Sequence, residues 1–251
     1  MAQAILAQGN TTQFSALLRF GFDSTIAYRV GMVKFVGFCA SVLVLASGVC
    51  PPEGFSSVEN LNLESYISSR WYIQQQMETE YLPKSKNWCV YAEYSRLANK
   101  SFWGYDVRVH NYAEEKDGTV HDSDKNIGGA GILAKIVDEK RGQLEVAPYF
   151  LPTFLAGPYW ILDYNEQEGY TLVSGGPPNK EGADGKCRTG TGTNNAGLWI
   201  FTRQQERDDK IIAKVRGIAS SRGFDLSVLN DVDQSNCTSA NKQSGPSAIL
   251  I

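Results

Sequence analysis

Hydrophobic and polar residues alternate over short stretches between positions 71 and 203, and this period of two is typical of half-buried β-strands. In Phe102–Tyr112, for example, the odd positions from 103 to 109 are apolar, whereas positions 106, 108 and 110 hold Asp, Arg and His. The pattern predicts strands over Trp71–Gln76, Cys89–Tyr94, Phe102–Tyr112, Lys125–Val137, Gly142–Phe150, Tyr159–Tyr164, Tyr170–Gly175 and Leu198–Arg203.

The predicted strands favour a closed antiparallel barrel. Turn sequences such as Asp117-Gly118 separate them, and helical spacing is almost absent, which argues against a parallel sheet of alternating strands and helices. Antiparallel strands of this number can close on themselves, which removes exposed edges and leaves space inside for one small ligand. The expected fold class is all-β, an eight-stranded antiparallel up-and-down β-barrel with one C-terminal α-helix.

That helix is predicted over Asp208–Ser221. Its apolar residues fall on one helical face, and Asp208 near its start and Gly223 just beyond its end suit the two helix termini. The apolar face consists of Ile211, Ile212, Val215, Ile218 and Ala219. We expect it to pack on the barrel wall.

The first 48 residues differ from the rest and are interpreted as a leader. Between Met32 and Gly48 a lone lysine precedes a run rich in Phe, Val, Leu and Ala, and small residues at Ala46 and Gly48 suit signal-peptidase cleavage before Val49. The run is shorter than the roughly 20 apolar residues of a membrane span, so a retained anchor is the minor interpretation. A signal peptide at about 32–48 predicts a secreted protein.

Residues 1–31 leave two interpretations open. They are either an upstream start or a transit peptide, and a transit peptide would direct the protein to a plastid thylakoid lumen. The expected organisation is a leader at 1–48, a barrel domain at 49–240 and a disordered tail at 241–251.

Composition excludes several functions. The formal net charge is −3 and basic residues form no stripe, so no nucleic-acid partner is expected. The chain has 2 histidines, His110 and His121, and neither lies in a cluster with the spacing of metal ligands. Phosphate-binding glycine motifs are also missing from the sequence. We therefore predict no metal, no cofactor and no catalytic residue.

Removal of the leader leaves Cys50, Cys89, Cys187 and Cys237, a number that suggests two disulfides in an exported domain. Four cysteines permit three pairings, which the count alone does not distinguish. Glycosylation sequons at Asn99 and Asn236 agree with export.

Three sequence blocks resemble the lipocalin family, and most closely the apolipoprotein D-like lipocalins. They are Ser69-Arg70-Trp71-Tyr72, Tyr159-Trp160-Ile161-Leu162-Asp163-Tyr164 and Leu198-Trp199-Ile200-Phe201-Thr202-Arg203, and the surroundings of the cysteines also match. The resemblance covers roughly 49–237 and departs from the family at Ser69 and Leu162, where glycine and threonine are usual. It implies that Arg203 stacks on Trp71 as a plug at the narrow end of the barrel. It also implies the disulfide pairs Cys50–Cys187 and Cys89–Cys237.

The resemblance further implies that the protein carries a small hydrophobic ligand. If Trp71 and Arg203 face inward, Phe201 and Trp199 share their side of the strand. Analogy adds Tyr94 and Ala92, and alternation adds Tyr105 and Val107; the alternative is that these side chains only fill the core.

Fatty acids, retinoids, steroids, carotenoids and bilins are the ligand classes that the resemblance allows. A plastid-lumen scavenger of lipids or pigments and a lipocalin-type isomerase or de-epoxidase are the alternative functions. A weak contact with a membrane or lipoprotein surface is expected from the apolar loop residues Phe150, Leu151, Phe154 and Leu155; the alternative is that this loop folds inward as a lid.

Overall fold

The structure is a computed structural model that describes residues 49–237. The predicted leader at 1–48, with its signal peptide at about 32–48, and the predicted tail at 241–251 lie outside the described residues.

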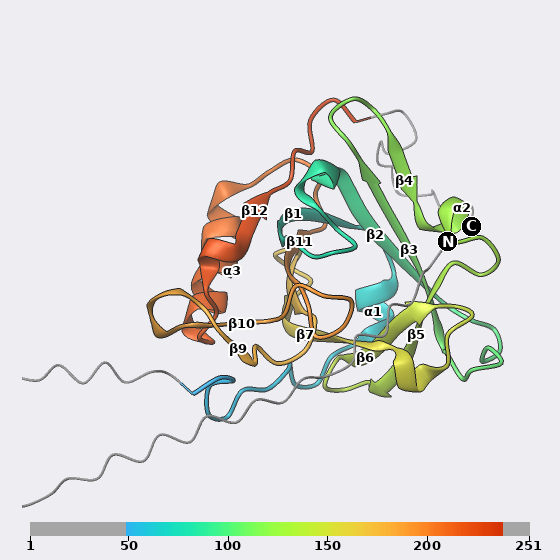
Figure 1. Cartoon of the computed structure of the whole chain (residues 1–251), viewed down its shortest axis with the longest axis horizontal. Coiled ribbons are helices and arrows are strands. Elements are labelled where there is room, and N and C mark those ends of the chain that lie inside the picture. Colours follow the sequence, from blue (N-terminus) through green and yellow to red (C-terminus); the bar gives the residue numbers. More distant parts are fainter. Residues whose placement is uncertain (1–48, 238–251) are drawn as a thin grey trace, which may run out of the picture. The chain divides into compact units, whose positions relative to one another are not determined.

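Eight antiparallel strands form a closed barrel, as the alternating pattern predicts (Figure 1). Each strand pairs with the next along the barrel, and the last pairs with the first, so the sheet has no free edge where β11 meets β1. The strands are β1 (Trp71–Met77), β2 (Trp88–Arg96), β3 (Val107–Glu114), β5 (Ile132–Asp138), β6 (Gln143–Pro148), β7 (Gly157–Asn165), β8 (Tyr170–Ser174) and β11 (Leu198–Thr202).

Shorter elements decorate this barrel. Strand β4 (Val120–Asp122) pairs with the end of β3, strand β12 (Leu229–Asp231) pairs with β1, and β9 (Lys180–Glu181) pairs with β10 (Cys187–Arg188). The described residues also contain four 3₁₀ helices: η1 (Lys84–Lys86), η2 (Thr153–Leu155), η3 (Ala183–Gly185) and η4 (Leu226–Val228).

Two predicted strands are too long. The segment before Val107 is a turn, in which the N–H of Gly104 donates to the carbonyl of Ser101 and Gly104 takes a φ of 84° that favours glycine. The segment before Ile132 contains the short helix α2 (Ser123–Asn126), whose first turn is capped by Asp122. In both segments, local hydrogen bonds form a turn or a short helix in place of the strand that the sequence pattern predicts.

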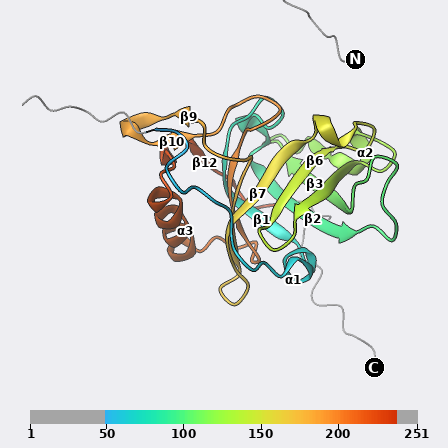
Figure 2. The same cartoon turned by 90° about the horizontal axis from the view of Figure 1, so that it is seen from below.

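The helix α3 (Asp209–Ser221) packs on the outer wall, as predicted (Figure 2). The carboxylate of Asp208 accepts hydrogen bonds from the N–H groups of Lys210 and Ile211 at the helix start. Val215 and Ala219 are fully buried against outward-facing side chains of β7, β8 and β11, namely Leu162, Leu172, Leu198 and Ile200.

A further helix, α1 (Leu63–Ile67), lies at one end of the barrel and was not predicted. Its side chains Leu63, Tyr66 and Ile67 are buried in the same cluster as the inward side chains of the strands. The sequence signal is present, because apolar residues at 63, 66 and 67 have helical spacing and Asn62 caps the first turn. Among the described helices, none has the length and apolarity that a membrane-spanning segment requires.

Both disulfides implied by the resemblance are present. Cys50 is bonded to Cys187 and Cys89 to Cys237. The first joins the N-terminal segment to β10, and the second joins β2 to the segment that follows β12. These cross-links close long loops of the unfolded chain and so reduce its conformational freedom.

Candidate ligand-binding site

The interior at the α1 end is filled around Trp71. This indole is fully buried, and its Nε1 donates to the carbonyl of Tyr66 at 2.9 Å. The guanidinium carbon of Arg203 lies 3.5 Å from the centroid of the Trp71 ring. A desolvated cation–π contact of this kind contributes about 2 kcal/mol.

Arg203 also caps the C-terminal end of α1. Its Nη1 donates to the carbonyl of Ser69 at 2.6 Å, and its Nη2 donates to those of Ser65 and Tyr66 at 2.9 and 3.1 Å. The same Nη2 lies 2.9 Å from a carboxylate oxygen of Glu166. Helix C-termini leave carbonyl groups without intrahelical donors, so one guanidinium satisfies several of them while it stacks on the indole.

Five of the six predicted ligand-binding residues lie in the interior cluster. Ala92, Val107 and Phe201 are buried there, whereas Tyr94 and Trp199 are only partly buried although they pack against it. Part of Tyr94 and part of Trp199 are therefore not covered by protein. Whether these residues bind a ligand stays a prediction.

Tyr105 does not share this interior cluster, and its placement by strand alternation was wrong. It is fully buried in a separate cluster with Leu133 and Ala147, and its hydroxyl donates to the carbonyl of Leu151 at 2.9 Å. The reason is that β3 begins only at Val107, so the alternation of that strand does not extend back through the turn at 101–106.

Three tyrosine hydroxyls meet inside the barrel. The hydroxyl of Tyr159 lies 2.7 Å from that of Tyr66 and 2.8 Å from that of Tyr94. Burial raises the pKa of Tyr94 to about 12 and raises the pKa values of Tyr66 and Tyr159 as well. All three hydroxyls therefore stay protonated and neutral at physiological pH. Sequence reasoning found Tyr94 but missed Tyr66 and Tyr159, which come from α1 and β7.

Trp199 lies beside a loop that has a glycine at the point of contact. A β-carbon added to Gly197 would lie 2.1 Å from the Trp199 ring, and Gly197 has a φ of +101°. Both constraints favour glycine, so Gly197 allows the indole to lie against the backbone.

The loop that ends at Gly197 contacts two other loops at the same end of the barrel. The carbonyl of Thr191 accepts from the N–H of Glu80 at 2.8 Å, and Asn194 Nδ2 donates to the carbonyl of Leu155 at 3.4 Å. Its other end is held by the Cys50–Cys187 disulfide. The three loops lie at the end of the barrel where β1 ends and β11 begins, which is the end opposite α1.

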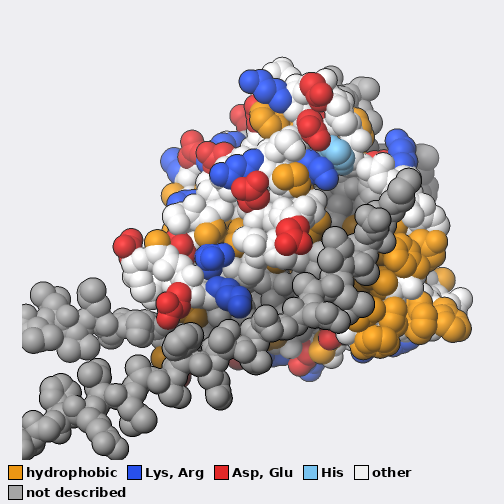
Figure 3. All heavy atoms as spheres, viewed as in Figure 1, with side chains coloured by type: hydrophobic (Ala, Val, Ile, Leu, Met, Phe, Trp, Pro, Cys, Tyr) orange, Lys and Arg blue, Asp and Glu red, His pale blue; other side chains and the backbone are white. Residues whose placement is uncertain are grey.

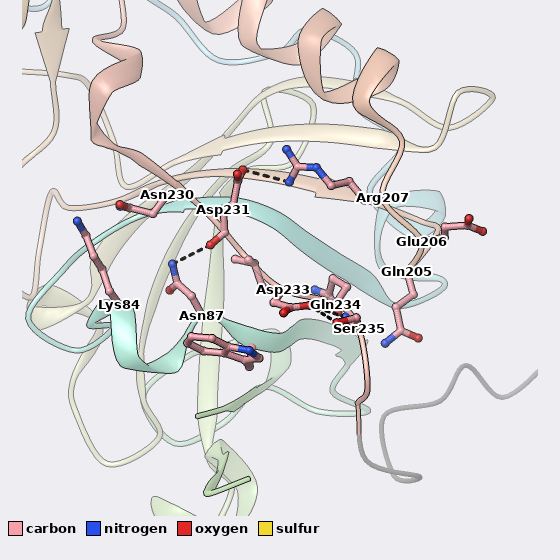
Figure 4. Close-up of a pocket in the computed structure, with 12 residues that line it drawn as sticks. Lys84, Asn87, Gln205, Glu206, Arg207, Asn230, Asp231, Asp233, Gln234 and Ser235 are labelled. Atoms are coloured by element: carbon pink, nitrogen blue, oxygen red, sulfur yellow. Dashed lines mark hydrogen bonds and ion pairs between the residues drawn. The ribbon is translucent and has the colours of Figure 1, made fainter. Parts of the chain in front are cut away.

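An open hollow of about 860 Å³ lies on the outside, along β12 and the segment after it (Figure 4). Some of its polar groups already have partners: Asp231 pairs with Arg207 at 3.1 Å, and the carbonyl of Asp231 accepts from Asn87 Nδ2 at 3.2 Å. The apolar inward face of the barrel is therefore the stronger candidate for binding a hydrophobic ligand.

A charged cluster covers the outer face of β2 and β3. The two ring nitrogens of His110 lie 3.0 Å from Glu93 and 3.1 Å from Asp122, and Asp124 lies close enough to complete a group with metal-ligand chemistry. The hydrogen bond with Glu93 raises the pKa of His110, and the hydrogen bond with His110 lowers the pKa of Glu93. Arg108 pairs with Asp124 at 2.9 Å, so the cluster is largely neutralised by its own members.

A comparison with protein-family models found no match. Apolipoprotein D of Mus musculus is 27% identical over 217 residues, which cover 83% of this chain and 97% of that protein. Among solved structures, insecticyanin from the tobacco hornworm Manduca sexta is 17% identical with a TM-score of 0.48, covering 78% of this chain and 90% of that one. Lobster apocrustacyanin A1 is 16% identical with a TM-score of 0.46, covering 69% and 79% of the respective chains.

The match to apolipoprotein D extends over most of both chains and confirms the resemblance to the lipocalin family that the three blocks predict.

Proposed function

We propose that this protein is an extracellular carrier that binds one small hydrophobic molecule inside its barrel and performs no chemistry on it. The observation that carries the proposal is the interior cluster, in which Tyr94, Tyr159 and Trp199 are partly exposed among buried apolar side chains. Apolar surroundings with a few hydroxyl and indole groups are typical of small-molecule sites. The two disulfides support an oxidising compartment.

Trp199→Ala tests this site. Removing the indole eliminates apolar contact area inside the barrel, and we expect the affinity for a bound hydrophobic fluorophore to fall by about 10-fold or more. The matched control is Trp103→Ala, because Trp103 is 40% exposed and precedes β3. Equal affinity in the wild-type protein and the Trp199→Ala variant would remove Trp199 from the site.

Secretion is a separate part of the proposal and has its own measurement. Expression of the full chain in a secreting eukaryotic host should yield a mature protein that begins at Val49, as determined by mass spectrometry. Retention of residues 1–31 inside a cell compartment would favour the plastid interpretation instead. Asn99 and Asn236 are exposed, so we expect glycan masses at these sequons that disappear on enzymatic deglycosylation.

An apolar surface patch supports a weak contact with lipid. Phe150, Phe154 and Leu155 are 55%, 83% and 49% exposed, whereas Leu151 packs beneath them in the Tyr105 cluster. Figure 3 shows hydrophobic side chains gathered over the region where β5 and β6 lie in Figure 1. The exposure of three of the four residues argues against a lid that folds inward. Phe154→Ser should reduce sedimentation with neutral phospholipid vesicles, and unchanged sedimentation would refute the contact.

A further inference from the structure

Hydroxyl groups form a cluster in the barrel interior, and the amide of Gln76, opposite Trp199, is a further buried polar group there. Tyr66, Tyr94 and Tyr159 contribute three hydroxyl protons, and hydrogen bonds of 2.7 and 2.8 Å join Tyr159 to the other two. Thr171, which is also fully buried, uses its own proton on the carbonyl of Asp163 at 2.8 Å. Hydroxyl protons rotate, so the tyrosine cluster can present one to an acceptor beside it.

The charge that acts on this cluster is that of Arg203, which opposes the rise in the pKa values of Tyr66 and Tyr94, but its guanidinium is already bound to α1 and to Glu166. Between the ends of the eight described barrel strands, the inward positions hold no lysine, arginine, histidine, aspartate or glutamate. Arg96 and Arg203 share the inward alternation but lie at strand ends. Arg96 pairs with Glu64 and Glu139, and Arg203 pairs with Glu166.

A hydroxyl cluster without an unpaired charge beside it favours neutral ligands over ionised ones. An ionised carboxylate loses its hydration on entering the barrel and finds no free cation there, and burial of an unpaired charge is strongly unfavourable. A ketone, amide or alcohol has a much smaller cost of dehydration, and one hydroxyl proton satisfies its oxygen. The raised pKa values of the three tyrosines agree with a preference for an oxygen acceptor, since their hydroxyls stay protonated and remain donors.

We propose that the barrel takes a neutral hydrophobic molecule with an oxygen acceptor, and that the hydroxyl cluster of Tyr66, Tyr94 and Tyr159 binds that oxygen. This inference rests on the proposed carrier function and narrows the class of ligand that the carrier binds. Neutral ketones, amides and alcohols are favoured, and the ionised forms of fatty acids and other carboxylates are disfavoured.

The test is a set of ligands with the same hydrocarbon chain. Hexadecanamide, 2-heptadecanone and hexadecanoate compete, at pH 8, against diphenylhexatriene, a hydrocarbon fluorophore without polar atoms. We expect the two neutral ligands to bind at least about 10-fold more tightly than the carboxylate. Tyr159→Phe should weaken the neutral ligands by about 3- to 10-fold, the range of one hydrogen bond, and leave the affinity for diphenylhexatriene unchanged. Tyr105→Phe is the control, because Tyr105 lies outside the interior cluster.

Equal or tighter binding of hexadecanoate would overturn the ligand class while the carrier function stands. A Tyr159→Phe variant that binds the neutral ligands as tightly as the wild-type protein would also overturn the assigned oxygen site. If Tyr159→Phe does not fold, Tyr94→Phe removes the other end of the same hydrogen-bond chain and gives the same comparison. If neither the fluorophore nor any of the ligands binds, the carrier function itself fails, and the ligand class with it.

Discussion

Two tryptophans on neighbouring strands, Trp71 and Trp199, face the interior of the same barrel but lie in opposite surroundings. Trp71 is fully buried, its Nε1 has an acceptor and Arg203 covers its ring. Trp199 is partly exposed and lies against the backbone of Gly197. The difference teaches that Trp71 lies in a filled region, which stabilises the fold, whereas Trp199 lies in a region where a side chain keeps part of its surface open; under the proposed function a ligand covers that surface.

The largest expected effect is on the free energy of unfolding, which should differ between alanine variants of the two tryptophans. Trp71→Ala should lower the free energy of unfolding by about 3–5 kcal/mol, because it creates a cavity and leaves Arg203 without its stacking partner. Urea denaturation measures this, with Trp199→Ala as the matched substitution. Equal losses of stability in the two variants would contradict the division between a filled and an open region.

The next effect concerns the loop beside Trp199. Replacing both Cys50 and Cys187 by alanine should lower the free energy of unfolding by about 2–4 kcal/mol, since the unfolded chain gains conformational freedom. Ligand affinity should fall as well, because the loop that ends at Gly197 loses its covalent anchor. The corresponding change at Cys89 and Cys237 is the control, for which we expect a similar loss of stability with little change in ligand affinity.

The Arg203→Lys variant tests what the guanidinium contributes to stability at the filled end of the barrel. Lysine keeps the positive charge but cannot donate to several carbonyl groups of α1 while it stacks flat on an indole. We expect a loss of about 1–3 kcal/mol in the free energy of unfolding, with ligand affinity within twofold of the wild-type value. A large loss of affinity would mean that the plug extends into the ligand site.

The smallest expected effect is the pH dependence of stability that arises from His110, which lies outside both regions. Its pKa is raised in the folded protein by Glu93, so its stabilising contribution is fully present below the unfolded pKa of about 6.5 and is lost as the pH rises through the folded pKa. NMR titration should show the raised value in the wild-type protein and a lower value in Glu93→Gln. Ligand binding by the two proteins should be alike, and a shared pH dependence of binding would link this outer cluster to the interior.

Local sequence signals predicted most of the barrel correctly. The period-two pattern placed all eight strands, and the helical spacing after Asp208 placed α3 with its cap. The errors occurred where hydrogen bonds within a turn or a short helix override alternation, before Val107 and before Ile132. Tyr105 was misplaced for this reason, since a strand pattern was extended through a turn.

The sequence by itself determined the alternation that separates the inward from the outward side chains and the number of cysteines available for cross-links. The blocks around Trp71, Trp199 and Arg203 allowed the relationship to lipocalins to be predicted, including both disulfide pairs. Only the tertiary structure decided which tyrosines share a hydrogen-bond chain. Tyr66, Tyr94 and Tyr159 come from α1, β2 and β7, and their hydroxyls meet because barrel closure brings distant segments across one interior. The division between the surroundings of Trp71 and Trp199 has the same origin, because it depends on how α1 and the loops fill the two ends.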